Sequence, residues 1–396
     1  MPRKNYATHG VDKYPAKMVP HLARYAIERT TPRGGVVYDP FCGCGTVLVE
    51  SLVSGRNAIG VDVNPFAVLL AKAKSLPCRP DRLRRLVADV VHCARRFRGS
   101  HQYGRWLSYW FSPLALTKLN ALRTAIHVMS DSLSSRYQNA LWTILALAVR
   151  GCSKADPRSP KPFISKKARV TRCGRHHDPF RTFCEVAERF ATATEDLRAR
   201  MVDGTTSTRA RLGDARRVRL KPRVDAVVTS PPYLSAQDYY RSSKLELAVI
   251  GHDVDPSKLG RNIIGSGRGN VTRPDLPFDD LPHQDVLTRL ERKERRARYV
   301  VETYLADMQQ VLHRVVESLK DGGRCCIIIG DSKIRGVCLP VHTWVAHLAG
   351  LAGLRLYRHE IDAIRDRRVP PSRQGHDSVI RDEHLLFLRK PRSASG

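Results

Sequence analysis

The sequence predicts a doubly wound α/β fold, in which helices cover both faces of a parallel sheet. Short apolar runs rich in Val, Ile and Ala, each bounded by Gly, Asp or Pro, are typical of strands buried in such a sheet. Helix-like segments separate these runs, and strand alternating with helix is the pattern of a doubly wound sheet. A chain of 396 residues with 42% hydrophobic content is long enough for one large or two ordinary domains.

The apolar runs and the segments between them give the expected elements. We expect buried strands at residues 36–39, 58–63, 225–230, 324–331, 354–363 and 384–390. The helix-like segments of the sheet lie at 46–55, 65–75, around 287–320 and at 340–353.

The alternation of strand and helix stops after about residue 80 and resumes near residue 212. Within this interval, apolar periodicity predicts helices at 114–130, 136–149 and 182–202. Residues 150–181 have turn and loop chemistry and contain ten Lys or Arg against two Asp. The interval therefore reads as a helical, basic insertion in the sheet domain.

The charge balance indicates a polyanionic partner. Lys and Arg number 68 and Asp and Glu 38, which gives a net charge of +30. Phosphate contacts release condensed counterions, so nucleic acid is the leading candidate and an anionic membrane surface the second. A protein that is merely basic is the alternative.

The longest apolar stretch, 141–149, is about half of what a membrane-spanning helix needs, and the N-terminus has no signal-like core. We expect a cytoplasmic protein. The ten cysteines include no C-x-x-C pair, so a reducing compartment fits best and the sequence predicts no metal site.

A glycine-rich turn follows the first strand, in "VVYDPFCGCGT" (36–46), and contains Asp39, Gly43 and Gly45. In a doubly wound sheet this turn lies at the carboxyl end of a central strand, where cofactors bind. The third glycine of the dinucleotide fingerprint is missing, and no G-x-x-x-x-G-K-[ST] occurs. The turn alone is therefore a weak indication of a cofactor site.

Asp62 strengthens the indication, because it ends the next strand seventeen positions after Gly45. A carboxylate at that place can accept hydrogen bonds from both ribose hydroxyls, which suits the adenosine of S-adenosylmethionine or NAD. The alternative is that Asp62 caps the following helix.

Three motifs in this order, "DPFCGCGT", "GVDVNPFA" and "TSPPY", resemble the amino-methyltransferases of DNA, which transfer the methyl group of S-adenosylmethionine to cytosine N4 or adenine N6. "THGVDKYPAKMVP" (8–20) is similar to the segment that closes over the methionine end of the cofactor. "LGDAR" (212–216) is similar to the element whose acid, here Asp214, contacts the adenine amino group. The resemblance covers 8–75 and 212–247 closely and 300–390 more loosely.

The resemblance implies a Rossmann-like class I methyltransferase fold with S-adenosylmethionine as cofactor and double-stranded DNA as partner. The resemblance does not cover the basic interval, so we expect a cofactor-binding half (1–80), an insertion whose charge makes it the candidate DNA-recognition region (81–211) and a catalytic half (212–396), in which 234–300 is a second candidate DNA-contacting region. The cofactor residues that it implies are Tyr14, Pro15, Asp39, Phe41, Gly43, Gly45, Thr46, Asp62 and Asp214.

The "SPPY" stretch explains how an unreactive amino group can be methylated. The lone pair of an exocyclic amino group is delocalised into the base, so both N–H bonds need acceptors that pull the nitrogen toward tetrahedral geometry. Ser230 Oγ and the Pro231 carbonyl can supply these acceptors, and Pro232 fixes the direction of that carbonyl. Tyr233 can stack on a base flipped out of the duplex. We expect direct displacement without a catalytic cysteine.

Serine at position 230 favours cytosine N4, because Asp or Asn is commoner there in adenine-N6 members of the family. The alternatives are an adenine-N6 enzyme, an RNA amino-methyltransferase and a non-catalytic basic DNA-binding protein. The recognition sequence, the oligomeric state and an accompanying restriction endonuclease stay open. The basic residues expected to contact DNA are Lys161, Lys166, Lys167, Arg169 and Arg241.

Overall fold

The computed structural model describes most of the chain. The described residues are 5–99, 103–156, 159, 161–164, 177–202, 204–234, 239–251, 263–265, 280–363 and 382–392.

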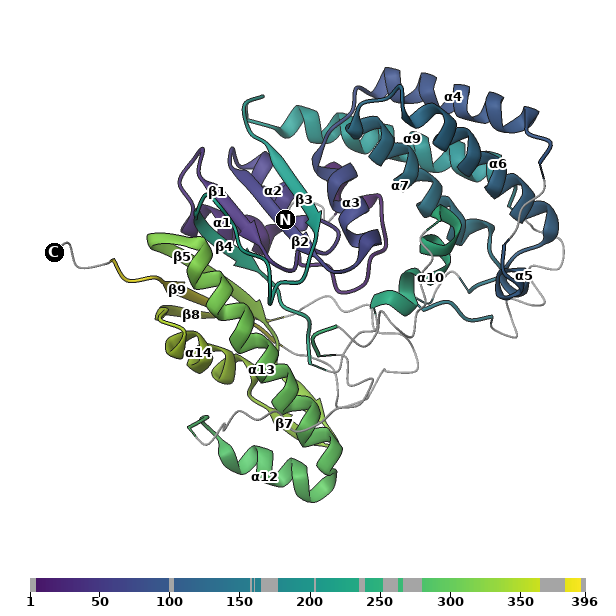
Figure 1. The fold of residues 1–396 in the computed structure, drawn as a ribbon. Coiled ribbons are helices and arrows are strands. Elements are labelled where there is room, and N and C mark those ends of the chain that lie inside the picture. The colour runs from purple at the N-terminus through teal and green to yellow at the C-terminus, as the bar shows by residue number, and fades with distance from the viewer. Residues whose placement is uncertain are drawn as a thin grey trace.

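A seven-stranded sheet with the order β3-β2-β1-β4-β5-β9-β8 forms the centre of the molecule (Figure 1). All neighbouring pairs from β3 to β5 are parallel, whereas β9 runs antiparallel to both β5 and β8. Its strands are β1 (Val36–Asp39), β2 (Asn57–Asp62), β3 (Thr208–Leu212), β4 (Val224–Thr229), β5 (Leu319–Ile329), β8 (Arg355–Ala363) and β9 (Asp382–Arg389). A separate two-stranded hairpin consists of β6 (Ser332–Ile334) and β7 (Val337–Leu339).

The predicted doubly wound sheet is confirmed, with corrections to its strands. The expectation of parallel strands throughout is wrong for β9, because the period-2 pattern of a strand does not encode its direction. The expectation that 354–363 is buried is also wrong, since β8 is an edge strand with mostly exposed side chains. Strand β3 was not expected, because the strands were assigned from apolar runs and this short segment, with Arg209 and Arg211, contains no such run.

Helices cover both faces of the sheet and fill the insertion. They are α1 (Pro20–Thr30), α2 (Thr46–Val53), α3 (Pro65–Ser75), α4 (Pro80–Arg96), α5 (Arg105–Trp110), α6 (Pro113–Ser130), α7 (Ser135–Cys152), α9 (Pro179–Arg200), α10 (Tyr239–Ile250), α12 (Gln284–Lys293), α13 (Arg295–Ser318) and α14 (Val341–Leu351), preceded by the short 3-10 helix η1 (Ala7–Gly10). The predicted helices at 46–55, 65–75, 114–130, 136–149, 182–202 and 340–353 are confirmed. The charged stretch 287–320 divides at Glu294, whose extended backbone separates α12 from α13.

Local sequence explains where several helices begin. Asn64, Ser112 and Asp178 each precede a proline, and each side chain accepts a hydrogen bond from a backbone N–H in the first turn. A polar N-cap followed by proline at the first helical position satisfies an unpaired N–H and fixes φ at the helical value. These three positions start α3, α6 and α9.

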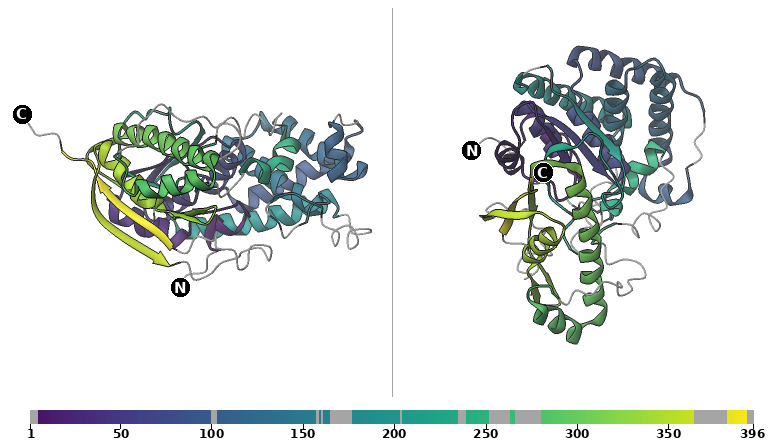
Figure 2. Two further views of the ribbon diagram at one scale, coloured as in Figure 1. Left: turned by 90° about the horizontal axis from the view of Figure 1, so that it is seen from below. Right: turned by 60° about the vertical axis from the view of Figure 1, so that its left-hand side comes forward.

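Alternate residues of the strands point to two different cores. Tyr38 and Val227 pack with α12, α13 and α14 on one face, whereas Val37 and Val228 pack with α1, α2 and α3 on the other. The views in Figure 2 show α13 and α14 on the face opposite α1. This two-sided burial is the reason that the strands of a doubly wound sheet read as continuous apolar runs.

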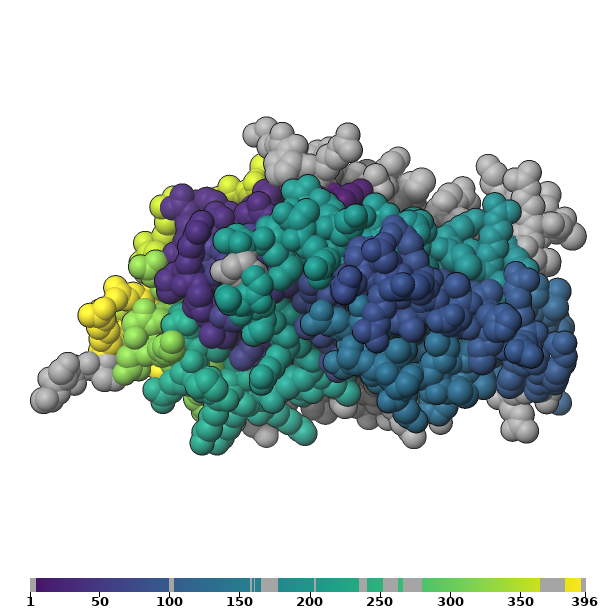
Figure 3. All heavy atoms as spheres, turned by 90° about the horizontal axis from the view of Figure 1, so that it is seen from above, coloured from purple at the N-terminus to yellow at the C-terminus, as the bar shows by residue number. Residues whose placement is uncertain are grey.

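The insertion forms a helical unit with its own core. Buried apolar side chains of α4, α5, α6, α7, α9 and α10 pack together in one cluster. In Figure 3 the blue residues, which belong to the helices of the insertion, lie at one end of an elongated molecule and the yellow C-terminal residues at the opposite end. None of the helices in the described part of the chain is long and apolar enough to span a bilayer.

Candidate active site

A cavity lies at the carboxyl ends of β1, β2 and β4, where a doubly wound sheet binds its ligands. Its empty space, including the solvent at its mouth, is about 880 Å³. The predicted site residues that line it are Tyr14, Asp39, Phe41, Gly43, Thr46, Asp62, Asp214, Ser230 and Pro232. Segments far apart in the sequence therefore converge on one cavity.

The glycine-rich turn needs glycine at two positions. Gly43 and Gly45 have φ values of +49° and +87°, in the left-handed region that glycine adopts at little cost. A Cβ at Gly45 would lie 2.8 Å from the Cα of Ala71, so this glycine lets α3 pack against the turn. A Cβ at Gly43 would point toward the ring of Tyr14 at 3.7 Å. Because Gly43 and Tyr14 both line the cavity, the missing Cβ leaves room for a ligand there.

Asp62 holds the turn in place through both of its carboxylate oxygens. Gly43 N–H donates to Oδ2 at 2.9 Å, and Asn64 N–H donates to Oδ1 at 2.8 Å. Burial raises the pKa of Asp62 to about 6, although these backbone donors act in the opposite direction. The N-cap of α3 is Asn64, whose Oδ1 accepts from Phe66 N–H, so the alternative role for Asp62 does not apply.

Asp39 joins the end of β1 to the end of β4. Its Oδ1 accepts hydrogen bonds from Thr229 Oγ1 at 2.6 Å and from the Phe41 N–H at 3.0 Å. Burial raises the pKa of this carboxyl to about 7. Thr229 directly precedes Ser230, so this contact fixes the point at which the "SPPY" stretch leaves the sheet.

Ser230 and Pro232 line the cavity, and Tyr233 lies next to them in the chain. The Tyr233 hydroxyl donates to Glu383 Oε1 on β9 at 2.9 Å, and its ring packs against the core on the α13 face. Burial raises the pKa of Glu383. The aromatic ring is therefore held at both ends, as a rigid stacking surface requires.

The N-terminal segment is fastened to the sheet domain by a buried ion pair. Lys74 Nζ on α3, whose side chain is fully buried, lies 2.8 Å from Asp12 Oδ2. The other oxygen of Asp12 accepts from the Tyr14 N–H at 2.8 Å. Lys74 Nζ also lies 3.4 Å from Cys44 Sγ in the glycine-rich turn. One lysine thus connects α3, the turn and the segment that carries Tyr14.

A second buried acid fastens the start of this segment. Glu50 of α2 accepts hydrogen bonds from Tyr6 and from Arg24, and it lies 2.6 Å from His9 Nε2. With this group and the Lys74 pair, residues 6–14 are fixed against α2 and α3.

Asp214 is engaged by a neighbouring arginine. Arg216 donates to both oxygens of Asp214 and lies 2.8 Å from Asp307 of α13. Burial alone would raise the pKa of Asp214, but the hydrogen bonds from Arg216 bring it below its ordinary value. The acid expected at the adenine amino group is thus ionised and held in position by α13.

Not every predicted site residue is part of the lining. Pro15, Gly45, Pro231 and Tyr233 lie in the same turns and segments without lining the cavity. Arg241 is exposed on α10, and Lys161 lies away from the cavity. Lys166, Lys167 and Arg169 are outside the described residues.

Several residues that complete the site were not expected from the sequence. Asn64 donates to the Tyr14 hydroxyl at 3.2 Å, and the Asn-Pro pair that caps α3 was the signal for its position. Lys74 had no such signal, because "AKAKS" reads as an ordinary solvated end of a helix. Ile263 and Ile264 line the cavity from a region with no predicted element.

Comparison with known proteins identifies the family. A family model described as DNA methylase matches residues 1–73. The type II methyltransferase M.MvaI of Kocuria varians is 31% identical over 97% of this chain and 91% of its own length. The chain belongs to the DNA amino-methyltransferase family. The present chain is also 34% identical to the type II methyltransferase M.MjaII of Methanocaldococcus jannaschii, over 22% of this chain and 17% of that relative.

Among solved structures, a SAM-dependent methyltransferase from Methanosarcina mazei is 6% identical, with 93% of this chain and 97% of that chain covered and a TM-score of 0.35. The fold is assigned by the strand order and by the antiparallel β9 rather than by this distant likeness.

S-adenosylmethionine is the cofactor of this methyltransferase, and the cavity fits it. Gly43 lines the cavity without a side chain, so a ligand can approach the backbone of the turn. The lining includes the carboxylates of Asp39, Asp62 and Asp214, which suit a cofactor with a positively charged sulfonium and with ribose hydroxyls that donate hydrogen bonds.

We expect S-adenosylmethionine to bind more weakly as the pH falls below about 6. The raised pKa of Asp62 means that acid protonates this carboxyl in the folded protein, and a neutral carboxyl is a poorer acceptor for ribose hydroxyls. Asp62→Ala should weaken binding by roughly 1.5–3 kcal/mol and flatten this part of the pH dependence. Calorimetric titrations between pH 5 and pH 8 measure both effects.

The pKa of Asp39 is also raised, to about 7, so two carboxyls of the cavity titrate in this pH range. The pH dependence of binding that remains in Asp62→Ala belongs to Asp39, and the part that disappears belongs to Asp62. Unchanged affinity in a folded Asp62→Ala variant would show that this acid does not hold the ribose.

Proposed function

We propose that this protein is a type II DNA methyltransferase that methylates the exocyclic N4 of cytosine in double-stranded DNA. The observation that carries the proposal is Ser230, which heads the "SPPY" stretch and lines the cofactor cavity at the end of β4. Serine here supplies a hydroxyl acceptor for an amino group, and it is the residue more common among N4 members of the family.

Residues of the "SPPY" stretch would bind and orient the target base. Ser230 Oγ and the Pro231 carbonyl accept the two N–H bonds of the flipped cytosine, which orients the nitrogen lone pair toward the cavity. Tyr233 stacks on the base with its ring fixed by Glu383. The bound cofactor supplies the methyl group. No acid in the site needs to act as a nucleophile, so positioning provides most of the acceleration.

The cofactor residues follow from the same cavity. Asp62 accepts from the ribose, Asp214 from the adenine amino group, and the segment around Tyr14 and Pro15 covers the methionine end. Phe41, Gly43 and Thr46 line the cavity beneath the cofactor, next to Asp39, and Gly45 shapes the turn that carries them.

The chemical identity of the methylated base tests this proposal. The protein is expressed in a host that lacks DNA methylation, and the hydrolysed DNA is analysed by nucleoside mass spectrometry. We expect N4-methylcytosine, and sequencing that distinguishes modified bases then gives the recognition site. N6-methyladenine as the product would make the protein an adenine methyltransferase, and methylation confined to RNA would overturn the DNA substrate.

The basic segment 150–181 is proposed to bind DNA phosphates, because ten basic residues face only two acids in a part that the methyltransferase core does not need. Replacing four residues together with Gln should weaken DNA binding almost equally for all sequences and lower the salt slope by up to about four, one per lost contact. The four residues are Lys161, Lys166, Lys167 and Arg169.

Fluorescence anisotropy with cognate and unrelated duplexes at several salt concentrations measures this slope. A matched variant changes to Gln four exposed basic residues that do not line the cavity, and it should keep the parent slope. These residues are Arg33, Lys221, Arg223 and Arg324. A parent-like slope in the first variant would mean that 150–181 is a solvated loop, and residues 234–300, which include Arg241, would become the next candidates for the DNA contacts.

A further inference from the structure

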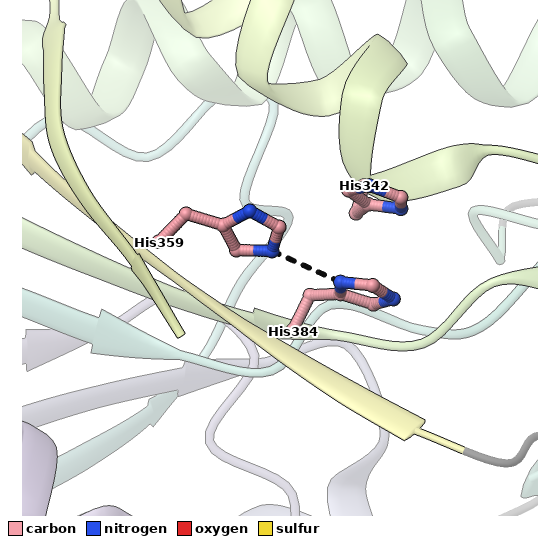
Figure 4. Close-up of side chains that lie close together, drawn as sticks. All are labelled: His342, His359 and His384. Carbon is pink, nitrogen blue, oxygen red and sulfur yellow. Dashed lines mark hydrogen bonds between the residues drawn. The ribbon is translucent and has the colours of Figure 1, made fainter. Parts of the chain in front are cut away.

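Three histidines from different elements lie together at one edge of the sheet. His342 belongs to the first turn of α14, His359 to β8 and His384 to β9 (Figure 4). One ring nitrogen from each lies within 4.8 Å of the others. His359 Nε2 and His384 Nδ1 are 3.0 Å apart, and the ring of His342 stacks on that of His384 at 3.8 Å. None of the three lines the cavity of the candidate active site.

A carboxylate orients one member of this histidine cluster. Asp331, just after β5, accepts from the backbone N–H of His342 and lies 2.7 Å from His342 Nδ1. When Nδ1–H donates to this carboxylate, the lone pair of His342 is placed on Nε2. A histidine whose second nitrogen donates to a carboxylate is the usual arrangement around metal-ligating imidazoles.

From this geometry we propose that His342, His359 and His384 bind a divalent metal ion of the zinc class. Three imidazoles are a recurrent zinc ligand set, and imidazole suits zinc better than the hard cations that prefer oxygen. Asp331 holds His342 through Nδ1 and stands 3.9 Å from His384 Nε2, so its negative charge favours a cation at this cluster. His359 is exposed, so the ion reaches the cluster from solvent.

Metal binding requires the imidazole rings to rotate from the positions that they take here. In the structure two rings are stacked in parallel planes and two meet nitrogen to nitrogen, so their lone pairs do not yet converge. The separation of 3.0 Å between the ring nitrogens of His359 and His384 is already near that of two ligands on one tetrahedral zinc, about 3.3 Å for bonds of about 2.0–2.1 Å.

The ion would connect α14, β8 and β9 to one another at the edge of the sheet. β8 is the edge strand of the sheet, α14 covers its end, and β9 lies between β8 and β5. Glu383, the neighbour of His384, holds the hydroxyl of Tyr233. The proposed ion therefore stabilises the part of the sheet from which the aromatic of the active site is held.

The test uses the full-length protein after removal of metals with a chelator. Zn²⁺ is titrated in competition with a chromophoric chelator, and unfolding is followed by differential scanning calorimetry. We expect one Zn²⁺ per chain at this site and a higher melting temperature with the ion than with the chelator. His342→Gln and His384→Gln should each weaken Zn²⁺ binding by more than about tenfold and remove the thermal shift.

His347→Gln is the matched control, because this residue lies on α14 outside the cluster and should bind Zn²⁺ as the parent does. If the cluster variants unfold, Co²⁺ bound to the parent decides: an absorption spectrum without thiolate charge transfer supports imidazole ligands, whereas a thiolate spectrum assigns the ion to cysteines and overturns the proposal. No stoichiometric Zn²⁺ on the parent, or equal affinity in folded His342→Gln and His384→Gln, overturns it as well.

Discussion

Ser230→Ala should lower the rate of methyl transfer by on the order of a hundredfold while leaving the affinity for S-adenosylmethionine nearly unchanged. The serine hydroxyl is proposed to accept an N–H that becomes more acidic as the amino nitrogen attacks, so its hydrogen bond is stronger in the transition state than in the ground state. Because alanine fills less space than serine, it leaves the walls of the cavity intact. Single-turnover rates on cognate DNA and calorimetric titration with the cofactor separate the two effects.

Ser230→Asp is the informative companion, since it restores an acceptor at the same position and should recover part of the lost rate. Ser132→Ala, at an exposed serine beyond the end of α6, should behave as the parent. Near-normal turnover of Ser230→Ala in a folded enzyme would remove the catalytic role of this serine and with it the main support for cytosine N4.

Lys74→Met should destabilise the folded protein by roughly 3–5 kcal/mol, because it leaves the Asp12 carboxylate buried without its cation. Both side chains are almost fully buried, at 0% and 1% exposed, and their atoms are 2.8 Å apart. Cofactor affinity should also fall, since Asp12 holds the backbone of Tyr14. Denaturant unfolding and calorimetry measure the two losses.

Two further variants test whether the loss of stability comes from the unpaired Asp12 carboxylate. Lys72→Met changes a lysine two residues earlier on α3 that forms no such pair, and it should cost little. Asp12→Leu combined with Lys74→Met removes both charges and should recover much of the stability, because replacing a whole buried pair by apolar residues is often neutral. If Lys74→Met is as stable as Lys72→Met, the pair does not fasten the N-terminal segment.

The same pair gives stability a dependence on acid. Burial alone would raise the pKa of Asp12, but Lys74 and Lys17 bring it below the ordinary value of 3.8. A lowered pKa means that the stabilisation is fully present above pH 4 and is lost as the pH falls through the lower pKa of the folded state. Lys74→Met should lose this acid-dependent part of its stability.

The candidate site could be predicted where its chemistry is local in sequence. Gly43 and Gly45 follow β1 directly, Asp62 ends β2, and Ser230 follows β4, so each residue is placed by the strand before it. Parallel strands bring their carboxyl ends to one edge, which is why three separate motifs could be assigned to one cavity from the sequence alone. The expected DNA contacts at Lys166, Lys167 and Arg169 stay predictions, because they lie outside the described residues.

The other features could not be predicted, because each depends on contacts between residues that are far apart in the chain. Lys74 looks like a surface lysine until α3 meets the segment that carries Asp12, 62 positions earlier. His342, His359 and His384 have none of the spacings of a metal motif, and they meet only because α14 folds back over an antiparallel pair of strands.

Preferences of neighbouring residues set the alternation of strands and helices, the two glycines of the turn, the acid that follows them and the rigid acceptor stretch at residue 230. These preferences are steric and hydrogen-bonding effects that act over a few positions, so they can be read along the chain. The direction of β9, the burial of Lys74 against Asp12, the anchoring of Tyr233 by Glu383 and the meeting of three histidines arise only when the chain is folded. Burial and pairing depend on which surfaces the sheet brings together, and strand alternation is the same for either direction of a strand.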